Sequence, residues 1–180
     1  MNRYINVRAF TKTKENEGSL MRIPVEWLIK EYQTNLFVTA FNVCKNAEDA
    51  KDVVQDTFIA YHTSNTQFND EQHIRAWLFR ITVNKAKDIR KSFWHRNKMP
   101  LEDYIESLPF ETKEDSNLFG AVMHLPEKYR IVIHLFYYED WNIREISEIL
   151  HISESNVKIR LSRGRALLKD VLKEEWTDDE

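Results

Sequence analysis

The sequence predicts an all-α protein with two helical domains joined by an acidic linker. Three observations support this fold class. The 180 residues include only three glycines and four prolines, so there are few points where a helix must stop. Apolar residues recur at spacings of three and four, the period of an amphipathic helix. Basic residues gather in two segments, and an acidic segment separates them.

Composition and length limit the class of protein. A chain of 180 residues is long enough for one or two domains that each bury a core. The single cysteine, Cys44, cannot form an internal disulfide, which favours a reducing compartment. No apolar run approaches the ~18 to 20 residues that span a bilayer, and the first ten residues lack the apolar region of a secretory signal. We therefore expect a cytoplasmic protein with no direct membrane insertion.

The distribution of charge matters more than its total. A net charge of −3 would by itself argue against nucleic-acid binding. However, residues 71–98 carry eight basic side chains against two acidic ones, and residues 154–169 carry five against one. Between them, residues 99–117 carry six acidic side chains against one lysine. Two basic segments that flank an acidic spacer are consistent with two DNA-binding surfaces on one chain.

Three helices are expected in the first half. Residues 24–44 have one apolar stripe, and Pro24 suits the first turn of a helix. Residues 47–62 form a second helix, whose acidic start agrees with the helix dipole. The Ser, Thr, Asn and Asp of residues 63–70 favour a loop. In the third helix, residues 71–94, one face is apolar and includes Trp77, which we assign to the core; the opposite face is basic.

The second half is expected to begin after the acidic linker, which contains Pro100 and Pro109. From Leu118, two short helices flank Pro126. Residues 142–169 then have the form of a helix-turn-helix: a short amphipathic helix, a break at residues 151–153, and a longer helix that begins at Glu154.

Ser153 and Gly164 define the second helix of this motif. Ser153 can cap its first turn, and Gly164, which costs ~1 kcal/mol of helix propensity, is explained by a close approach of a neighbouring helix. The basic side of the helix could be an ordinary solvated surface. The turn, the cap and the preceding run of isoleucines favour DNA, because Lys and Arg on such a helix reach phosphates and guanine edges in the major groove.

At this point the sequence resembles a family, the extracytoplasmic-function (ECF) sigma factors of the sigma-70 family. Residues 125–130 (LPEKYR), 138–150 (YEDWNIREISEIL) and 152–165 (ISESNVKIRLSRGR) resemble sigma region 4. Residues 47–58 (AEDAKDVVQDTF) resemble region 2.2, and residues 76–88 (AWLFRITVNKAKD) resemble regions 2.3 and 2.4. A helix-turn-helix alone is shared by many regulators, whereas its pairing with the region 2.2 helix in this order is specific.

The resemblance implies a domain map and a function. The map has an N-terminal extension (1–20), region 2 (21–97), an acidic linker (98–117), region 4 (118–173) and an acidic tail (174–180). The implied function is binding of core RNA polymerase and promoter-specific initiation of transcription, with no catalytic residue, metal or cofactor. The expected partners are core RNA polymerase, through its β′ clamp helices and β flap, promoter DNA and an anti-sigma factor. We expect a monomer.

The resemblance also implies roles for individual residues. The predicted core polymerase-binding residues are Asp52, Gln55, Asp56 and Phe58. The predicted −10 element contacts, which capture a flipped base and hold phosphates, are Phe68, Asn69, Arg80, Ile81, Asn84, Lys87 and Lys91. The predicted −35 element contacts are Ser155, Asn156, Lys158, Ile159, Ser162, Arg163 and Arg165.

Simpler interpretations stay open for some of these residues. The acidic start of the region 2.2 helix could serve only the helix dipole, Asn84 could be an ordinary border residue, and a flexible linker can be acidic without mimicking nucleic acid. His151 stands in the turn where a helix-turn-helix often has Gly, which predicts a strained turn.

Two alternatives concern the whole chain. It could be a stand-alone helix-turn-helix regulator that binds an operator without polymerase, in which case a dimer with paired half-sites is expected. Residues 1–20 have no counterpart in the family core, and the run from Met21 to Pro24 suggests that they are either an upstream extension or the product of a mis-assigned start.

Overall fold

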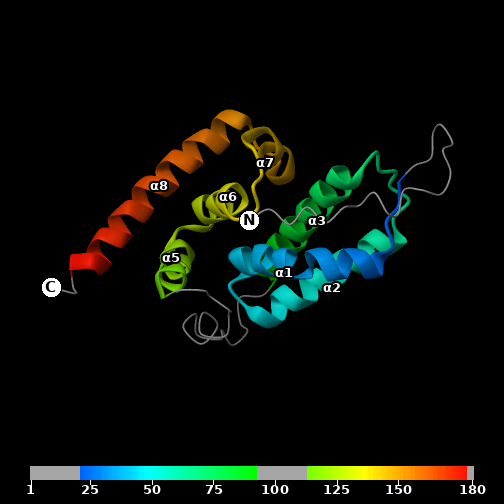
Figure 1. The fold of residues 1–180 in the computed structure, drawn as a ribbon, viewed down its shortest axis with the longest axis horizontal. Helices are drawn as coiled ribbons and strands as arrows, with labels where there is room; N and C mark the ends of the chain where they lie inside the picture. Colours follow the sequence, from blue (N-terminus) through cyan, green and yellow to red (C-terminus); the bar gives the residue numbers. More distant parts are fainter. Residues whose placement is uncertain (1–20, 93–112, 178–180) are drawn as a thin grey trace.

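The computed structural model describes residues 21–92 and 113–177, with side chains for 21–89 and 118–172. These residues form seven helices (Figure 1). The first bundle consists of α1 (Val25–Cys44), α2 (Ala47–Thr63) and α3 (Glu71–Ser92). The second consists of α5 (Lys113–His124), α6 (Glu127–Tyr137), α7 (Ile143–Leu150) and α8 (Glu154–Thr177). The all-α, two-unit fold that the sequence predicts is confirmed.

The first bundle is organised around the tight connection between α1 and α2. Lys45 takes the left-handed conformation that ends α1, with φ 53°. The Asn46 side chain then accepts a hydrogen bond from the backbone N–H of Asp49 at 3.0 Å, and so caps α2. With the two helices turned back on each other, α3 packs across both, and its Thr82 hydroxyl lies 3.2 Å from that of Thr57 in the core.

The loop between α2 and α3 is anchored by an aromatic side chain. Phe68 is fully buried, with its ring centroid 5.5 Å from that of Tyr61 and 5.8 Å from that of Trp77. Its carbonyl accepts a hydrogen bond from the backbone N–H of Met21 at 3.0 Å. Trp77 is 8% exposed, which confirms its assignment to the core.

The second bundle begins earlier than the sequence suggested. Helix α5 starts at Lys113, whereas we expected an irregular linker as far as residue 117. The stretch 113–119 contains no Pro or Gly, and Glu114 and Asp115 suit the positive end of a helix dipole. The remainder of the predicted linker lies outside the described residues. The Pro-free acidic stretch therefore belongs to the helical unit.

Both helices of the helix-turn-helix begin where the sequence predicted, after Asn142 and after Ser153. Asn142 and Glu145 form a reciprocal capping box at the start of α7, with hydrogen bonds of 3.0 and 2.9 Å. The turn passes through His151 in the left-handed region, at φ 53° and ψ 49°, as its place in the motif predicted. Ser153 Oγ then accepts from the backbone N–H of Asn156 at 3.2 Å and caps α8.

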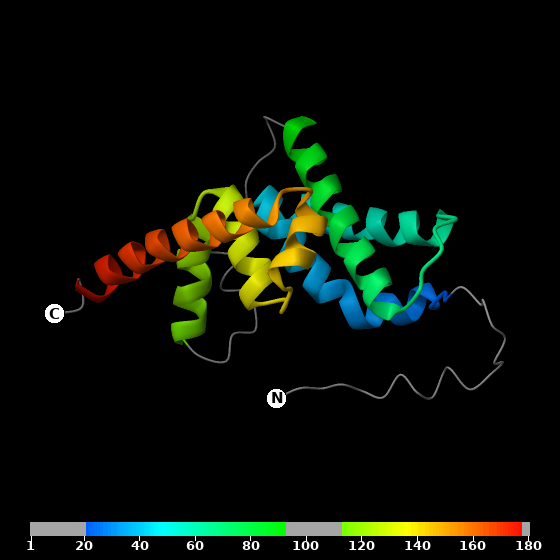
Figure 2. The same cartoon turned by 90° about the horizontal axis from the view of Figure 1, so that it is seen from above.

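The two bundles lie against each other. Helix α6 contacts α1, and α7 contacts α3, so the helix-turn-helix is seated beside the third helix of the first bundle (Figures 1 and 2). Within the described residues, no helix is both long enough and apolar enough to cross a membrane.

Gly164 is the close-packing point between α8 and α6. A Cβ placed there would lie 3.0 Å from Ile133 Cγ1 and 3.4 Å from Tyr129 Cβ. We expect Gly164→Leu to lower the free energy of unfolding by about 1–2 kcal/mol, since overpacking of ~1–3 kcal/mol outweighs a gain of ~1 kcal/mol in helix propensity. Urea denaturation measures the change. Ala166→Leu, at an exposed position of the same helix, is the matched control and should be nearly neutral; equal stability of the two variants would contradict the close approach.

Candidate nucleic-acid and polymerase interfaces

The outer side of α8 is the most exposed of the three predicted surfaces. Val157 and Leu161 are buried and turn the helix so that its polar side faces solvent. We call this polar side the recognition face, and all its members are exposed: Ser155, Lys158, Ile159, Ser162, Arg163 and Arg165. Asn156, also predicted to contact DNA, is half-buried, and its Oδ1 accepts a hydrogen bond from Arg160 Nε at 2.9 Å.

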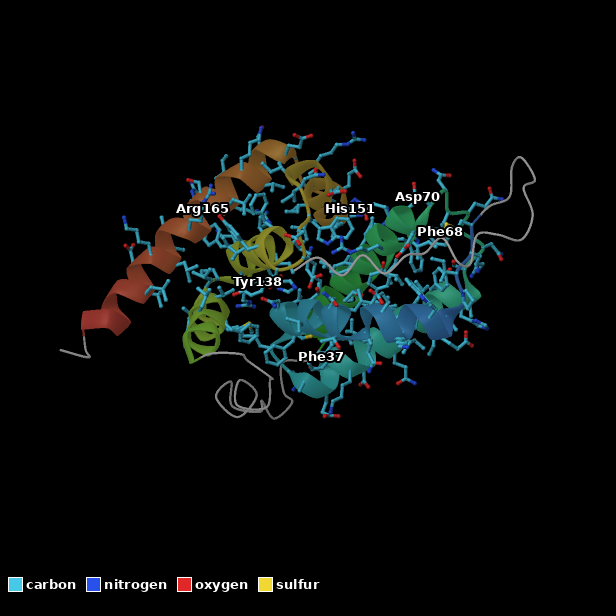
Figure 3. The ribbon with its side chains drawn as sticks, viewed as in Figure 1. Phe37, Phe68, Asp70, Tyr138, His151 and Arg165 are labelled. Carbon is cyan, nitrogen blue, oxygen red and sulfur yellow. The ribbon has the colours of Figure 1, made fainter. Side chains whose placement is uncertain are left out.

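Two tyrosines of α6 support the arginines of the recognition face. Arg165 Nη1 donates to Tyr137 Oη at 3.3 Å, and Arg165 projects from the outside of α8 (Figure 3). A hydrogen bond with Arg163 lowers the pKa of Tyr129. The sequence analysis did not predict a role for either tyrosine. In the structure, Tyr137 is 50% exposed, which is unusual for an aromatic residue in a helix.

The basic face of α3 is less exposed than the sequence predicted. Arg80, Asn84 and Lys87, which we call the basic arc, are half-buried, as is Ile81 beside them. The side chain of Lys91 lies outside those described. Phe79, Val83 and Ala86 of the same helix are all 0% exposed. The reason is that α3 packs on two sides, against α1 and α2 and also against α7.

Phe68 is a correction to the predicted −10 contacts. We expected its ring to be presented in a polar loop, but the ring is fully buried between Tyr61 and Trp77 and offers no stacking surface to a base. Its neighbour Asn69 is exposed, and Asp70, labelled with Phe68 in Figure 3, caps α3 by accepting from the backbone N–H of His73 at 2.7 Å. The polar composition around Phe68 predicts the loop but hides the apolar anchor within it.

The predicted polymerase-binding residues consist of three exposed polar side chains of α2 and one buried aromatic side chain. Asp52, Gln55 and Asp56 are exposed on α2, as expected, and Asp56 accepts from Lys85 Nζ at 3.2 Å. Phe58 is only 5% exposed and lies on the apolar side of α2, next to these polar side chains. It faces α1, because the apolar stripes of the two helices pack together.

Phe58 contributes to an apolar groove between α1 and α2 with a volume of about 790 Å³. Its apolar lining comes from both helices, and Lys51, Gln55 and His62 are among the polar residues that line it. Ile59, in the same lining, is 52% exposed. Aliphatic and aromatic side chains in an open groove are the usual receptor for the apolar face of a partner helix. The groove-lining residues are Val25, Ile29, Gln33, Thr34, Phe37, Lys51, Val54, Gln55, Phe58, Ile59 and His62.

A buried carboxylate lies where the two bundles meet. Glu139, in the connection between α6 and α7, is 4% exposed and accepts a hydrogen bond from Asn35 Nδ2 of α1 at 2.9 Å. It also lies 3.6 Å from Arg75 Nη2 of α3 and 3.5 Å from Nε2 of the buried His134. Burial raises the pKa of Glu139 to about 7 and lowers that of His134 to about 3.

The protonation state of His134 follows from its partner on α1. The Thr39 hydroxyl donates to the carbonyl of Asn35 at 2.8 Å, so it can only accept from His134 Nε2, 3.0 Å away. A neutral His134 with its proton on Nε2 satisfies this bond, in agreement with its lowered pKa. The histidine therefore joins α6 to α1 without carrying a charge.

Within the described residues, no group of three or more His, Cys, Asp or Glu side chains is arranged to hold a metal ion. The surfaces described above consist of hydrogen-bonding, charged and apolar side chains. Such an arrangement can bind nucleic acid and protein helices.

Comparison with known proteins gives a consistent result over most of the chain. The family "Sigma-70 region 2" matches residues 28–96, and the family "Sigma-70, region 4" matches residues 117–168. RNA polymerase sigma factor SigV of Bacillus subtilis is 29% identical, with coverage of 82% of this chain and 90% of the relative. ECF RNA polymerase sigma factor SigL of Mycobacterium tuberculosis is 30% identical, with coverage of 88% and 92%.

Two solved structures resemble this fold. CnrH in complex with the cytosolic domain of CnrY has 26% identity and a TM-score of 0.61, with coverage of 83% of this chain and 87% of CnrH. The sigma factor RpoE of Bartonella quintana, in complex with the anti-sigma factor NepR, has 19% identity and a TM-score of 0.63, with coverage of 82% and 96%. The second likeness concerns the fold alone.

The buried Glu139 gives the stability of the chain a pH dependence. Because burial raises its pKa from 4.5 to about 7, the folded chain keeps a proton that the unfolded chain has released. This stabilisation is fully present below the unfolded pKa and is lost as the pH rises through about 7. From pH 5 to pH 8, we expect the unchanged chain to lose stability relative to Glu139→Gln, as measured by urea denaturation. The titration of His134 is common to both chains and cancels; a difference that stays constant with pH would contradict the burial of this carboxyl group.

Proposed function

The chain belongs to the sigma-70 family as an ECF RNA polymerase sigma factor, which directs transcription to promoters, and we propose that its two bundles read two elements of one promoter. The observation that carries this proposal is the presence of two separate cation-bearing surfaces, the recognition face of α8 and the basic arc of α3. Each is built on a rigid helix of its own bundle. The covalent connection between the bundles lets one chain engage both elements.

The recognition face is proposed to read the −35 element in the major groove. Lys158, Arg163 and Arg165 supply exposed cations for phosphates and guanine edges, while Ser155, Ser162 and Ile159 supply hydroxyl and apolar contacts. Asn156 contributes through its bond to Arg160, which fixes the start of the helix. Tyr137 and Tyr129 hold the two arginines from the side of α6.

The basic arc is proposed to act at the −10 element during promoter opening. A flipped base costs a few kcal/mol of stacking, which amide and cationic groups can recover. Asn84 and Arg80 offer these groups beside Ile81, and Lys87 supplies a further cation for the phosphates. Lys91, whose side chain lies outside those described, is proposed as a phosphate contact from the sequence resemblance alone. Asn69 lies in the loop that precedes this helix, whereas the buried Phe68 is excluded from this role.

The apolar groove and the acidic outer side of α2 are proposed to bind core RNA polymerase. The resemblance implies that the β′ clamp helices bind at Asp52, Gln55, Asp56 and Phe58, and two of these residues, Gln55 and Phe58, line the groove. A groove of about 790 Å³ lined by apolar side chains supports this proposal, because it fits the apolar face of a helix. Exposed Asp52 and Asp56 border this surface and favour a basic partner. The β flap would meet the second bundle.

An anti-sigma factor is proposed as a competitor for the same groove. The similar proteins CnrH and RpoE were both solved in complex with a second protein, CnrY and NepR respectively. A helix of an anti-sigma partner in the groove would block polymerase by direct overlap. We further propose a cytoplasmic monomer without catalytic activity of its own, since the polymerase supplies the chemistry.

The domain map is also proposed in revised form. Region 2 occupies residues 21–97 and region 4 reaches residue 173, but the second unit begins at Lys113 because α5 begins there. Residues 98–112 remain the proposed acidic linker, with residues 1–20 an extension and 174–180 an acidic tail.

Run-off transcription with purified core polymerase and sequencing of the RNA starts tests the proposed function. We expect initiation only when both proteins are present, at promoters that share two elements. A stand-alone regulator, the alternative function, would instead bind its operator tightly without polymerase and would direct no initiation.

We expect substitutions in the two DNA-binding surfaces to impair different steps, promoter binding and promoter opening. We expect Arg163→Ala to weaken promoter binding by the holoenzyme about tenfold, which corresponds to ~1–3 kcal/mol for a lost base contact. Asn84→Ala should leave initial binding nearly unchanged and slow promoter opening. Filter binding measures the first step and permanganate reactivity of unpaired thymines measures the second; equal loss of both steps in both variants would contradict this division.

Two exposed isoleucines form a matched pair for the polymerase surface. Ile59 lines the apolar groove and is 52% exposed, and Ile159 lies on the recognition face and is 50% exposed. We expect Ile59→Asp to weaken binding to core polymerase at least tenfold, because a carboxylate in an apolar contact must be desolvated. Ile159→Asp should leave core binding unchanged and weaken −35 binding. Fluorescence anisotropy with labelled protein measures binding to core polymerase and to −35 DNA. Weaker core binding by Ile159→Asp than by Ile59→Asp would contradict the groove as the polymerase-binding surface.

A further inference from the structure

We propose that the segment from Met21 to Ile23, which we call the strap, positions the loop before α3 for reading one base of the −10 element, and that Arg22 is its main positioning residue. The loop comprises residues 64–70 and carries the exposed Asn69. This proposal rests on the proposed role of Asn69 at the −10 element. It adds residues outside both DNA-binding surfaces that determine how selectively the base is read without contacting DNA themselves.

Helix α2 ends in a way that leaves its last carbonyl groups open to an outside donor. Ser64, at the end of the helix, is extended, at φ −72° and ψ 148°, whereas α1 ends with Lys45 in the left-handed conformation. An extended residue leads the chain away from the helix, so no following turn of backbone covers these carbonyl groups. They also form the negative end of the helix dipole, which favours a cation.

Arg22 supplies this cation from about forty residues earlier in the chain. Its Nη1 donates to the Ser64 carbonyl at 2.8 Å, and its Nη2 donates to the carbonyls of His62, at 3.2 Å, and Tyr61. The guanidinium also lies over the Tyr61 ring, 5.0 Å from the centroid. Because the guanidinium is a planar fork of donors, it fixes the strap against both the end of α2 and the start of the loop.

The hydroxyl of Tyr61 fastens the strap at a second point. It accepts a hydrogen bond from the backbone N–H of Ile23 at 3.0 Å and donates one to the backbone carbonyl of the same residue at 2.9 Å. One side chain of α2 thus satisfies both polar backbone groups of a strap residue. The strap therefore has one defined position along α2.

The strap in turn contacts the loop at Phe68. The backbone N–H of Met21 donates to the Phe68 carbonyl at 3.0 Å, as an isolated antiparallel bridge between strap and loop, which lie side by side (Figures 1 and 2). The Phe68 ring stacks on Tyr61, with the centroids 5.5 Å apart. The ring that Arg22 covers is therefore the same ring that holds the loop.

Asn69 directly follows this anchored residue. Its backbone N–H donates to Nδ1 of His73 at 3.4 Å, and Asp70 caps α3, so the backbone on both sides of Asn69 is held while its side chain stays exposed. An amide distinguishes bases by the placement of its donor and acceptor against the edge of the base. If the loop moved, the same amide could bond to more than one base, and selectivity would fall.

Base preference separates positioning from simple stabilisation. A less stable bundle lowers the amount of active protein and reduces transcription from every promoter by the same factor. A displaced loop instead changes the ratio of transcription between promoters that differ at one base of the −10 element. The ratio is measured by run-off transcription with core polymerase, on promoters that carry each of the four bases at each −10 position.

Two variants release the strap by different chemistry. Arg22→Ala removes a guanidinium from an exposed residue, and Tyr61→Phe removes only the hydroxyl that fastens the strap. Thr57→Val is the matched control, because it removes another buried hydroxyl of α2, whose bonds run to α2 itself and to α3. Asn69→Ala identifies the base that the loop reads.

We expect the unchanged chain to prefer one base about tenfold at one −10 position, the range of a good base contact, and Asn69→Ala to lose this preference. Arg22→Ala and Tyr61→Phe should each reduce the preference at that position by about threefold or more, because a displaced amide loses part of its discrimination. Thr57→Val should keep the ratio of the unchanged chain even if its total transcript falls.

The contrary outcomes distinguish this proposal from the function on which it rests. No transcript with the unchanged chain from any promoter would overturn the proposed function. A −10 preference that Asn69→Ala leaves intact would overturn the role of Asn69 and, with it, the positioning role of the strap. If Asn69→Ala loses the preference but either Arg22→Ala or Tyr61→Phe keeps it, the strap alone is overturned. An equal change of the ratio in Thr57→Val would also overturn it.

Discussion

Helix α3 packs against α1 and α2 of its own bundle and against α7 of the second bundle, and this packing determines which of its side chains stay accessible. One face of α3 packs in the core of its own bundle, a second face packs against α7, and the remaining face carries the basic arc. The fully buried Phe79, Val83 and Ala86 mark the parts given to packing. Arg80, Asn84 and Lys87 are thereby held at fixed positions on a rigid helix, which is what a base-capturing surface requires.

The contact between the bundles depends on a charge that is expensive to bury. Asn35, Arg75 and the neutral His134 surround Glu139 in the interface. The pKa of Glu139 is nevertheless raised to about 7, because the effect of burial on the pKa exceeds the opposite effect of Asn35 and Arg75. A purely apolar contact would hold the bundles together more firmly. The polar contact, which leaves Trp141 Nε1 and Asn42 Oδ1 buried without a hydrogen-bond partner, resembles the interfaces between separable domains of one chain.

Local patterns in the sequence were sufficient for the elements and for the recognition face. The cap at Ser153, the left-handed turn at His151 and the close approach at Gly164 depend on neighbours within a few residues or on one packed helix. The sequence predictions failed where contacts with distant residues determine burial. Phe68 is buried by side chains of two helices, and the second packed side of α3 is created by α7, about seventy residues later in the chain. Periodicity along one helix cannot reveal such contacts.

Two surfaces of one chain are proposed to read separate stretches of one promoter within the polymerase. Photo-crosslinking from single positions tests this proposal, with a photoreactive residue introduced at Ser162 in one sample and at Asn84 in another. In the complex with core polymerase and promoter DNA, we expect adducts from Ser162 in the upstream duplex and from Asn84 near the point of strand opening. Adducts from both positions on the same stretch of DNA, or equal adducts without polymerase, would contradict it.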